Sequence, residues 1–337
     1  MRAPPLAVSA VDYHTGGEPF RIVSGGVRPL RGRTMLEKRR DARRSLDHVR
    51  RLLVDEPRGH ADMYGCFVTE PEDDRAALGV VFFHNEGYST ACGHGTIALV
   101  TWALDSGYVE APPQGEVELA VDTPSGRVAC LARRRDDGSV ASVRFRNVPS
   151  FVLARDLRLP SSRGELMLDV AFGGAFYGSL DLRSLGLAVD AASLPALIAL
   201  ERELRPALEA AVAVVHPLQR ELAGIYGVVF HQDEPGEGLV QRNVTVFADG
   251  AVDRSPCGSG TSARLALLHD EGALAGGREL EHLSIVGSRF RGRVAGEVDV
   301  AGRRAVVTEV EGSAHICARH DFLLDPDDPL GTGFLLR

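Results

Sequence analysis

The stretch DRSPCGSGT (residues 253–261) is a polar turn that brings a cysteine, Cys257, to a glycine-rich loop, and an apolar helical pattern follows at once. Cys257 is therefore predicted at a helix start, where the first backbone N–H groups have no partner within the helix. These donors and the positive end of the helix dipole favour a thiolate. The same N–H groups, together with the space left by Gly258 and Gly260, are suited to bind a small carboxylate.

A second copy of this stretch lies about half the chain earlier. The segment CGHGTIALVTWALDSG (residues 92–107) aligns without a gap on CGSGTSARLALLHDEG (residues 257–272). A shorter echo, DYHTGG (residues 12–17) against DVAFGG (residues 169–174), precedes each segment at nearly the same spacing. Two motifs that recur in the same order predict a duplicated domain, with one cysteine-bearing helix start in each half.

The composition limits the class of protein. The chain has 337 residues, enough for two cores, and its net charge of −8 argues against a nucleic-acid-binding surface. It shows no apolar run of the roughly 20 residues that a membrane span needs. Five cysteines without a C-x-x-C pair predict neither a disulfide framework nor a metal site. We therefore expect a cytoplasmic protein with free thiols.

The patterns along the chain predict an α+β or mixed α/β fold with two similar domains and an active site in the cleft between them. We expect a first domain over residues 1–157, a second over 165–325, and a C-terminal segment, 326–337, that packs back on the first. Amphipathic helices are predicted over 36–54 and 194–215, besides the two cysteine helices. Strands are expected over 6–13, 20–23, 63–69, 78–83, 117–121, 127–132, 140–145, 166–171, 227–230, 243–247, 283–286, 292–300, 304–311 and 315–322.

The five cysteines divide into two groups. Cys66, Cys130 and Cys317 lie inside apolar strand patterns, where a buried thiol is the expected state. Cys92 and Cys257 lie between polar turn residues and glycine, which favours a functional role.

Three roles are open to the paired cysteines. A Cys–His nucleophile is disfavoured, because the histidine of the first loop follows the cysteine by only two residues and the second loop has serine there. A redox pair stays open, since the sequence does not fix the distance between the sulfurs. Two equivalent acid/base groups also suit proton removal from one face of a carbon and proton return to the other. No signature for pyridoxal phosphate or for a dinucleotide appears, so we expect chemistry without a cofactor.

These residues resemble the proline racemase superfamily over essentially the whole chain. The matching pieces are HTGGEPFRIV, EPRGHADMYG, HNEGYSTACGHG, GGAFY, VTVFADGAVDRSPCGSGTSARLAL and DPLGTGFLLR. The resemblance implies a diaminopimelate-epimerase-like fold and no cofactor.

Carried over residue by residue, the resemblance also implies roles. Cys92 matches the first proton acceptor, and Gly93 and His94 match a substrate-binding pair. Asp253 matches the acid that binds the ring amine, although a cap on the following turn is a structural role that it could fill as well.

The second loop completes the implied site. Cys257 takes the place of the second acid/base group, and Gly258 and Ser259 match the second carboxylate-binding turn. Several of the matching pieces resemble the trans-3-hydroxy-L-proline dehydratase branch, whose members typically carry threonine where this chain has Cys257. A cysteine there restores the second proton donor that epimerisation requires.

We therefore expect a trans-3-hydroxy-L-proline dehydratase with 3-hydroxyproline 2-epimerase activity as a second reaction. The alternatives are a 4-hydroxyproline 2-epimerase or proline racemase, and a non-catalytic binder of a proline-like ligand. The expected partner is a small proline or hydroxyproline molecule, with no nucleic acid and no membrane, and a homodimer is left open.

Overall fold

The computed structural model describes residues 6–336, which form two compact units. One unit reaches to Val143 and resumes at Ser313, and the other is Arg144–Gly312. These boundaries differ from the expected ones, 157 and 325, because two strands pair with partners that the sequence pattern did not reveal. We describe each unit by itself.

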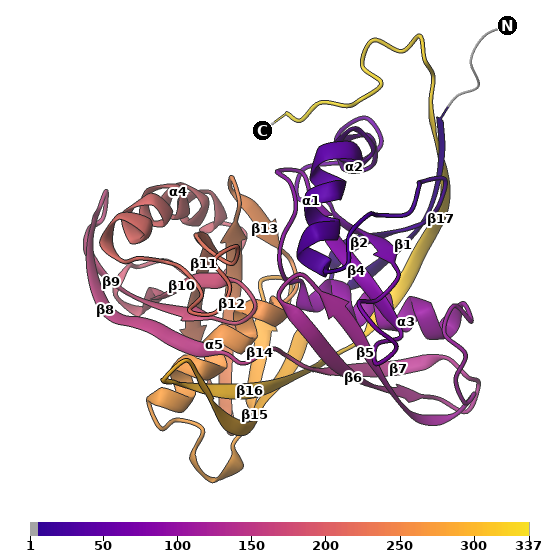
Figure 1. The fold of residues 1–337 in the computed structure, drawn as a ribbon. Helices are drawn as coiled ribbons and strands as arrows, with labels where there is room; N and C mark the ends of the chain where they lie inside the picture. The colour runs from indigo at the N-terminus through magenta and orange to yellow at the C-terminus, as the bar shows by residue number, and fades with distance from the viewer. Residues whose placement is uncertain (1–5, 337) are drawn as a thin grey trace, which may run out of the picture. The chain divides into compact units, whose positions relative to one another are not determined.

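The first unit is a mixed sheet with three helices (Figure 1). Its strands pair in the order β17-β1-β2-β3-β4-β5-β6, and β2 with β3 and β4 with β5 are the parallel neighbours. The elements are β1 (Leu6–Thr15), β2 (Glu18–Gly25), α1 (Met35–Ser45), α2 (Asp47–Val54), β3 (Tyr64–Thr69), β4 (Leu78–His84), α3 (Gly93–Asp105), β5 (Gly115–Thr123), β6 (Gly126–Arg134), β7 (Val140–Arg146) and β17 (Ala314–Leu324). The boundary at Val143 falls within β7.

The second unit pairs its strands in the order β8-β9-β10-β11-β12-β14-β15-β16, with β10–β11 and β12–β14 parallel. Its elements are β8 (Phe151–Ser161), β9 (Gly164–Phe172), β10 (Phe176–Asp181), η1 (Leu182–Ser184), α4 (Leu194–Ala211), β11 (Ile225–Asp233), β12 (Leu239–Phe247), β13 (Ala251–Asp253), α5 (Gly258–Asp270), η2 (Ala275–Gly277), β14 (Leu280–Ser284), β15 (Arg289–Val300) and β16 (Arg303–Gly312). Strands β9 to β12 repeat the order and the sense of pairing of β1 to β4.

Long-range pairing explains the shifted boundaries. β17 runs antiparallel along the whole of β1, from Leu6 opposite Leu324 to Thr15 opposite Ala314, so the yellow strand of Figure 1 lies beside the indigo one. Likewise β8 pairs with β9, and the polar segment 157–164 that we expected as a boundary is part of this hairpin. Nothing local in β17 indicates a partner at the other end of the chain, and the segment that forms β8 was not expected to be a strand.

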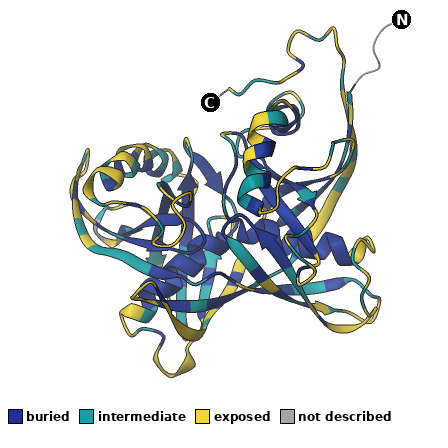
Figure 2. Ribbon diagram, viewed as in Figure 1, coloured by how far each residue is buried: buried dark blue, intermediate teal, exposed yellow. Residues whose placement is uncertain are grey.

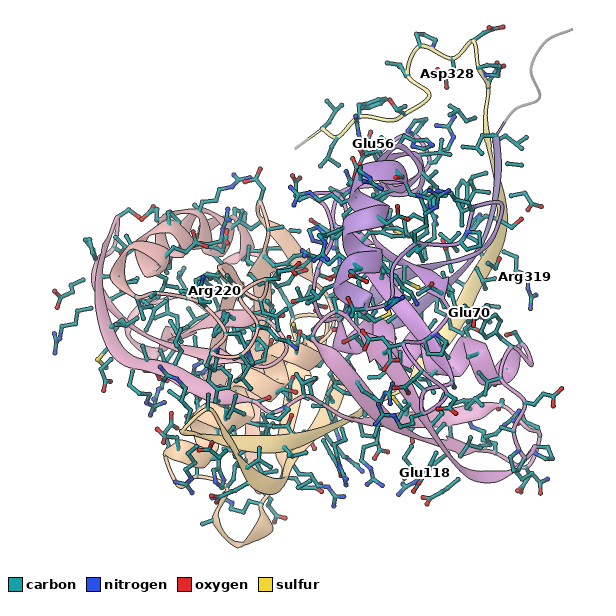
Figure 3. All side chains as sticks on the ribbon, in the orientation of Figure 1. Glu56, Glu70, Glu118, Arg220, Arg319 and Asp328 are labelled. Carbon is teal, nitrogen blue, oxygen red and sulfur yellow. The ribbon has the colours of Figure 1, made fainter. Side chains whose placement is uncertain are left out.

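The C-terminal segment after β17 packs on the first unit. Glu56 and Phe334 exchange two backbone hydrogen bonds, of 2.8 and 2.9 Å. The Arg58 guanidinium lies 3.4 Å from the Asp328 carboxylate. Glu56 and Asp328 are labelled in Figure 3.

The predicted helix over residues 36–54 is two helices. Thr34 caps α1 through a capping box, in which its hydroxyl accepts from Glu37 N–H and the Glu37 carboxylate accepts from Thr34 N–H. Leu46 (φ −123°, ψ 11°) leaves the helical conformation and turns its side chain into the core. Asp47 then places a carboxylate in the first turn of α2, where negative charge is favourable. The other predicted helix, α4, ends at Ala211, four residues earlier than expected.

The two cysteine helices are the centres of their units. α3 packs against β1, β2, β3, β6 and β17, whereas α5 packs against β8, β9, β10, β15 and β16. Every residue from 93 to 104 and from 258 to 268 is buried, as the dark blue helices of Figure 2 show. Strands therefore surround each helix, and its first turn has a fixed orientation.

Helix α4 carries an ionisable group on its buried face. Glu201 is fully buried, and its carboxylate lies 3.1 Å from Arg205 Nε. Burial outweighs the attraction of this arginine and raises the pKa of Glu201 to about 7. The folded chain thus binds a proton here more tightly than the unfolded chain, so Glu201 contributes stability below about pH 4.5 that is lost as the pH rises through 7.

Replacing this group removes that pH dependence. We expect Glu201→Gln to raise the free energy of unfolding at pH 8 by on the order of 2 kcal/mol and to change it little at pH 4.5, because glutamine is uncharged at both values. Urea unfolding at the two pH values measures the difference. Glu203→Gln is the matched control on the same helix, since that carboxylate is exposed and its pKa is lowered by a hydrogen bond from Ser162 N–H. Equal stability of the Glu201→Gln variant and the wild type at pH 8 would contradict the assignment.

Candidate active site

Cys92 is the N-cap residue of α3. Its backbone is extended (φ −154°, ψ 102°), and its Sγ accepts a hydrogen bond from Gly95 N–H at 3.3 Å. The side chain is 5 % exposed. The sulfur therefore occupies the place of a capping oxygen, as the sequence predicts, and stands among the N–H groups of the helix start.

The imidazole of His94 lies against this sulfur. Nε2 is 3.4 Å and Nδ1 is 3.6 Å from Cys92 Sγ. The ring is fixed by edge-to-face contacts with Phe20 and Tyr64, whose centroids are 5.7 and 5.0 Å away. The two side chains are in contact although only one residue separates them, because the first helical turn brings His94 over the cap. A protonated imidazole in this place would stabilise a thiolate.

Glycine is required at the same position of both helices. A Cβ atom on Gly95 would lie 2.7 Å from Cys92 Sγ and 2.4 Å from the Phe20 ring. A Cβ atom on Gly260 would lie 3.0 Å from Cys257 Sγ. Only glycine lets each sulfur lie over the first turn of its own helix.

Cys257 is the N-cap residue of α5 but has a different backbone. Its φ of 60° lies in the left-handed region, which costs a non-glycine residue about 1 kcal/mol or more. Ser255 Oγ accepts from Cys257 N–H at 3.1 Å, and Cys257 O accepts from Thr261 N–H at 2.7 Å. These two bonds hold the strained turn.

Asp253, at the end of β13, builds the turn before this cysteine. Its Oδ1 accepts from both the N–H and the hydroxyl of Ser255, at 2.8 and 2.7 Å, and the residue is 3 % exposed. Asp253 is therefore the turn cap that the sequence suggested. A role in binding the ring amine remains a proposal.

The surroundings of the Cys257 sulfur favour the protonated thiol over the thiolate. Burial, followed by the charge of the Asp253 carboxylate, raises its pKa to about 12, although Gly260 N–H, Thr245 and Tyr177 act in the opposite direction. The expectation that the helix start makes this residue a thiolate is thus not met, because desolvation of the sulfur outweighs the helix N–H groups. A thiol suits a proton donor.

Gly258 and Ser259 form the first turn of α5, as expected. The sequence argument assigned no role to Tyr177, although it belongs to the GGAFY piece of the resemblance. The Tyr177 hydroxyl lies 2.6 Å from Ser259 Oγ and 3.9 Å from Cys257 Sγ. This contact joins residues about 80 positions apart, so no local pattern predicts it.

The remaining cysteines are only partly as expected. Cys66 and Cys130 are buried in β3 and β6. Cys317 is exposed, which corrects the prediction of a core position. Three successive residues of its strand, His315 to Cys317, are exposed, and Cys317 lies where the register against β1 shifts.

No cluster of three or more histidine, cysteine, aspartate or glutamate side chains within residues 6–336 is arranged to hold a metal ion. In the same range no helix has both the length and the apolar character needed to cross a membrane.

Comparison with known proteins identifies the family. The model of the proline racemase family matches residues 10–335. The chain belongs to the proline racemase family. Membership agrees with the motifs quoted above, and it places both cysteine helices inside the matched region.

Individual members of the proline racemase family are similar over nearly their full length. A trans-3-hydroxy-L-proline dehydratase of Bacillus thuringiensis subsp. konkukian is 44% identical over 328 residues, which cover 97% of this chain and 98% of that protein. A 3-hydroxyproline 2-epimerase of Burkholderia multivorans is 44% identical over 332 residues, 98% of each chain.

A solved member of the family shares the fold. The crystal structure of a hydroxyproline epimerase from Agrobacterium vitis, with bound trans-4-hydroxy-L-proline, superposes with a TM-score of 0.92 at 33% identity. The match covers 100% of this chain and 97% of that one. The mixed sheets with buried helices described above are therefore the fold of this family.

Proposed function

We propose that this protein is a cofactor-independent trans-3-hydroxy-L-proline dehydratase that also epimerises 3-hydroxyproline at C2. The dehydratase of B. thuringiensis and the epimerase of B. multivorans, each 44% identical over nearly the whole chain, support the two reactions. The observation that carries the proposal is a cysteine at the start of each central helix, with surroundings suited to opposite tasks. Cys92 lies against an imidazole and a backbone N–H group, whereas Cys257 is a buried thiol.

The proposed dehydration begins at Cys92. A Cys92 thiolate, stabilised by His94 and Gly95 N–H, takes the proton from the α-carbon, so that the C–H bond breaks and an S–H bond forms. The electron pair left on the α-carbon forms the C2–C3 double bond as the C3–O bond breaks. The leaving hydroxide takes up the proton that Cys92 has received, which restores the thiolate, and water and pyrroline-2-carboxylate are formed.

The helix starts provide the proposed substrate contacts. The first-turn N–H groups of Gly93 and His94, and of Gly258 and Ser259, are suited to the substrate carboxylate and to the negative charge that develops on it. Asp253 is proposed to bind the ring amine through a charge-assisted hydrogen bond. The common strand order of the two units supports an origin by duplication. We propose that both helix starts reach the substrate, with the cysteines on opposite faces of the α-carbon.

Epimerisation uses the second cysteine. After Cys92 has removed the proton, the Cys257 thiol donates its own proton to the opposite face of the α-carbon. An alternative substrate is favoured by one observation, the trans-4-hydroxy-L-proline bound in the A. vitis epimerase. A 4-hydroxyproline 2-epimerase or proline racemase is therefore the second candidate.

Assaying the purified protein on three substrates tests the proposal. We expect trans-3-hydroxy-L-proline to give pyrroline-2-carboxylate and inverted substrate, with slower inversion of trans-4-hydroxy-L-proline and L-proline. Faster turnover of either of the latter two, without dehydration, would favour the second candidate. Turnover of none of the three would contradict both.

The proposed role of Asp253 is tested with the substrate and with a second ligand, pyrrole-2-carboxylate. This ligand should bind as a mimic of the planar intermediate, because its α-carbon is trigonal. Asp253→Ala should raise KM for substrate by roughly 10-fold or more, since the ring amine loses a charged partner worth on the order of 1.5–3 kcal/mol. Pyrrole-2-carboxylate, whose ring nitrogen is uncharged, should lose less affinity. Because Asp253 also caps the turn, Ser255→Ala is the control that keeps the carboxylate but removes the serine hydroxyl, with its bond to Asp253 and the bond that it accepts from Cys257 N–H. An equal loss of affinity in the two variants would mean that Asp253 is only a cap.

A further inference from the structure

Three side chains form a buried polar group beside the second catalytic position. Tyr177 projects from β10, and Cys257 and Ser259 belong to the start of α5. The tyrosine hydroxyl is 2.6 Å from Ser259 Oγ and 3.9 Å from Cys257 Sγ, and Cys257 Sγ is 3.9 Å from Ser259 Oγ. Tyr177 is 1 % exposed, so its hydroxyl is cut off from bulk water.

The hydrogen bonds of this group depend on the charge of the sulfur. A thiol donates to the tyrosine oxygen, so the Tyr177 hydroxyl proton points to Ser259 and the serine proton is free to point elsewhere. A thiolate only accepts. The tyrosine proton then turns to the sulfur, and Ser259 donates to the tyrosine oxygen. Rotation of the Tyr177 hydroxyl about its C–O bond therefore allows a hydrogen bond between Tyr177 and Cys257 in both protonation states of the sulfur.

The tyrosine keeps its proton throughout this exchange. Burial raises the pKa of Tyr177 well above 10, and negative charge on Cys257 raises it further, with a contribution from Tyr226. The other groups that act on the Cys257 sulfur are the Asp253 carboxylate, which disfavours a thiolate, and Gly260 N–H and Thr245, which favour one.

We propose that Tyr177 is the positioning residue for Cys257, and that its hydroxyl holds the sulfur as a thiol and supplies a hydrogen bond to it as a thiolate. This inference rests on the proposed function, because it assigns a proton-transfer role to Cys257. When Cys257 protonates the α-carbon, its S–H bond breaks, a C–H bond forms with the carbanion electron pair, and the charge moves to the sulfur. Without Tyr177 that charge is buried with one fewer donor, which is costly.

The same exchange links the second cysteine to substrate binding. In the thiol state Ser259 is free to donate to a substrate carboxylate, whereas in the thiolate state it donates to Tyr177. The carboxylate is therefore held most firmly while Cys257 is ready to give a proton. Once Cys257 has given up its proton, Ser259 no longer donates to the carboxylate, which favours release of the inverted product.

Alkylation of Cys257 tests the hydrogen bond without any substrate. Iodoacetamide labelling is followed at Cys257 by peptide mass spectrometry at pH 8 to 9.5, in the wild type, Tyr177→Phe and Tyr226→Phe. Tyr226→Phe is the control, because it also removes one tyrosine hydroxyl, from the ring whose centroid lies 5.7 Å from that of Tyr177. Without the tyrosine hydroxyl, we expect the fraction of Cys257 present as thiolate to fall about tenfold. Because a thiolate of higher pKa is also a stronger nucleophile, labelling of Tyr177→Phe should slow by only about threefold. Mere loosening of the structure would expose the sulfur and speed labelling, so a rate equal to or above the wild type overturns the proposal.

Ser259→Ala gives the opposite expectation and does not depend on the folding of the tyrosine variant. In this variant the Tyr177 hydroxyl can bond only to the Cys257 sulfur among these three side chains. Labelling of Cys257 should therefore stay at the wild-type rate or rise. A threefold decrease in this variant would show that the serine, and not the tyrosine, supports the thiolate, which overturns the proposal.

Product analysis in D2O provides the catalytic readout. Tyr177→Phe should lower the ratio of inversion to dehydration by about tenfold and move the pH optimum of inversion upward, because only inversion needs Cys257. Tyr226→Phe should leave both unchanged. An unchanged ratio in Tyr177→Phe overturns the inference, whereas absence of both reactions in the wild type would be a failure of the proposed function. The labelling result stands independently of that failure.

Discussion

Replacement of Cys92 by alanine is expected to lower turnover of every substrate by about 10³-fold or more, because dehydration and inversion both begin with loss of the α-proton and alanine has no group to accept it. The variant should fold, since the change removes one buried sulfur and one cap hydrogen bond, from Gly95 N–H, at a cost of about 1 kcal/mol. Single-turnover formation of pyrroline-2-carboxylate and deuterium uptake at the α-carbon measure the two losses.

Cys317→Ala is the matched control for this experiment. It makes the same chemical change at an exposed cysteine of β17, in the same unit, and should leave both rates unchanged. A folded Cys92→Ala protein that retains more than a few per cent of the wild-type dehydration rate would contradict the role of Cys92 as the base.

Replacement of Cys257 by threonine is expected to separate the two reactions. Inversion should fall by about 10²-fold or more, because a hydroxyl has a far higher pKa than a thiol and is a poor proton donor to the carbanion. Dehydration should survive within about tenfold, since Cys92 still removes the proton and the hydroxyl still leaves. Following both products in D2O gives the two rates from one sample.

The backbone of Cys257 calls for a second variant beside threonine. Its φ of 60° is unfavourable for a β-branched residue, so threonine adds strain as well as new chemistry. Cys257→Ser makes the same exchange of thiol for hydroxyl without the branch. Agreement between the two variants assigns the effect to the proton donor, whereas loss of dehydration in both would show that the proposed division of labour between the cysteines is wrong.

The sequence predicted those parts of the site that depend on neighbouring residues. Cys92 and Cys257 lie at helix starts, as their loops indicate, because caps are made from residues within one turn of each other. Glycine is needed three residues after each cysteine for the same local reason. The turn made by Asp253 with Ser255 was also readable from the sequence.

The architecture was predicted in outline only. Most expected strands are present, but the one expected over 283–286 ends at Ser284, and β8 and β10 were not expected. The helix over residues 36–54 breaks at Leu46, where burial of a side chain overrides a continuous amphipathic pattern. The units end at Val143 and Gly312 because β17 pairs with β1 and β8 with β9. The pairing of β17 with β1 joins opposite ends of the chain and leaves no local signature, whereas β8 and β9 are neighbours in the sequence and the strand β8 was not expected.

The chemistry of the two cysteines is where tertiary structure decided most. The sequence determined that each half presents a cysteine at a glycine-rich helix start, since backbone donors and turn residues are local. It could not determine that α5 is buried on every side, and this burial raises the pKa of Cys257 to about 12 and makes it a thiol. Nor could it place the hydroxyl of Tyr177 beside that sulfur. Desolvation and long-range contacts set the protonation state of a buried group, and both exist only once the whole unit has folded.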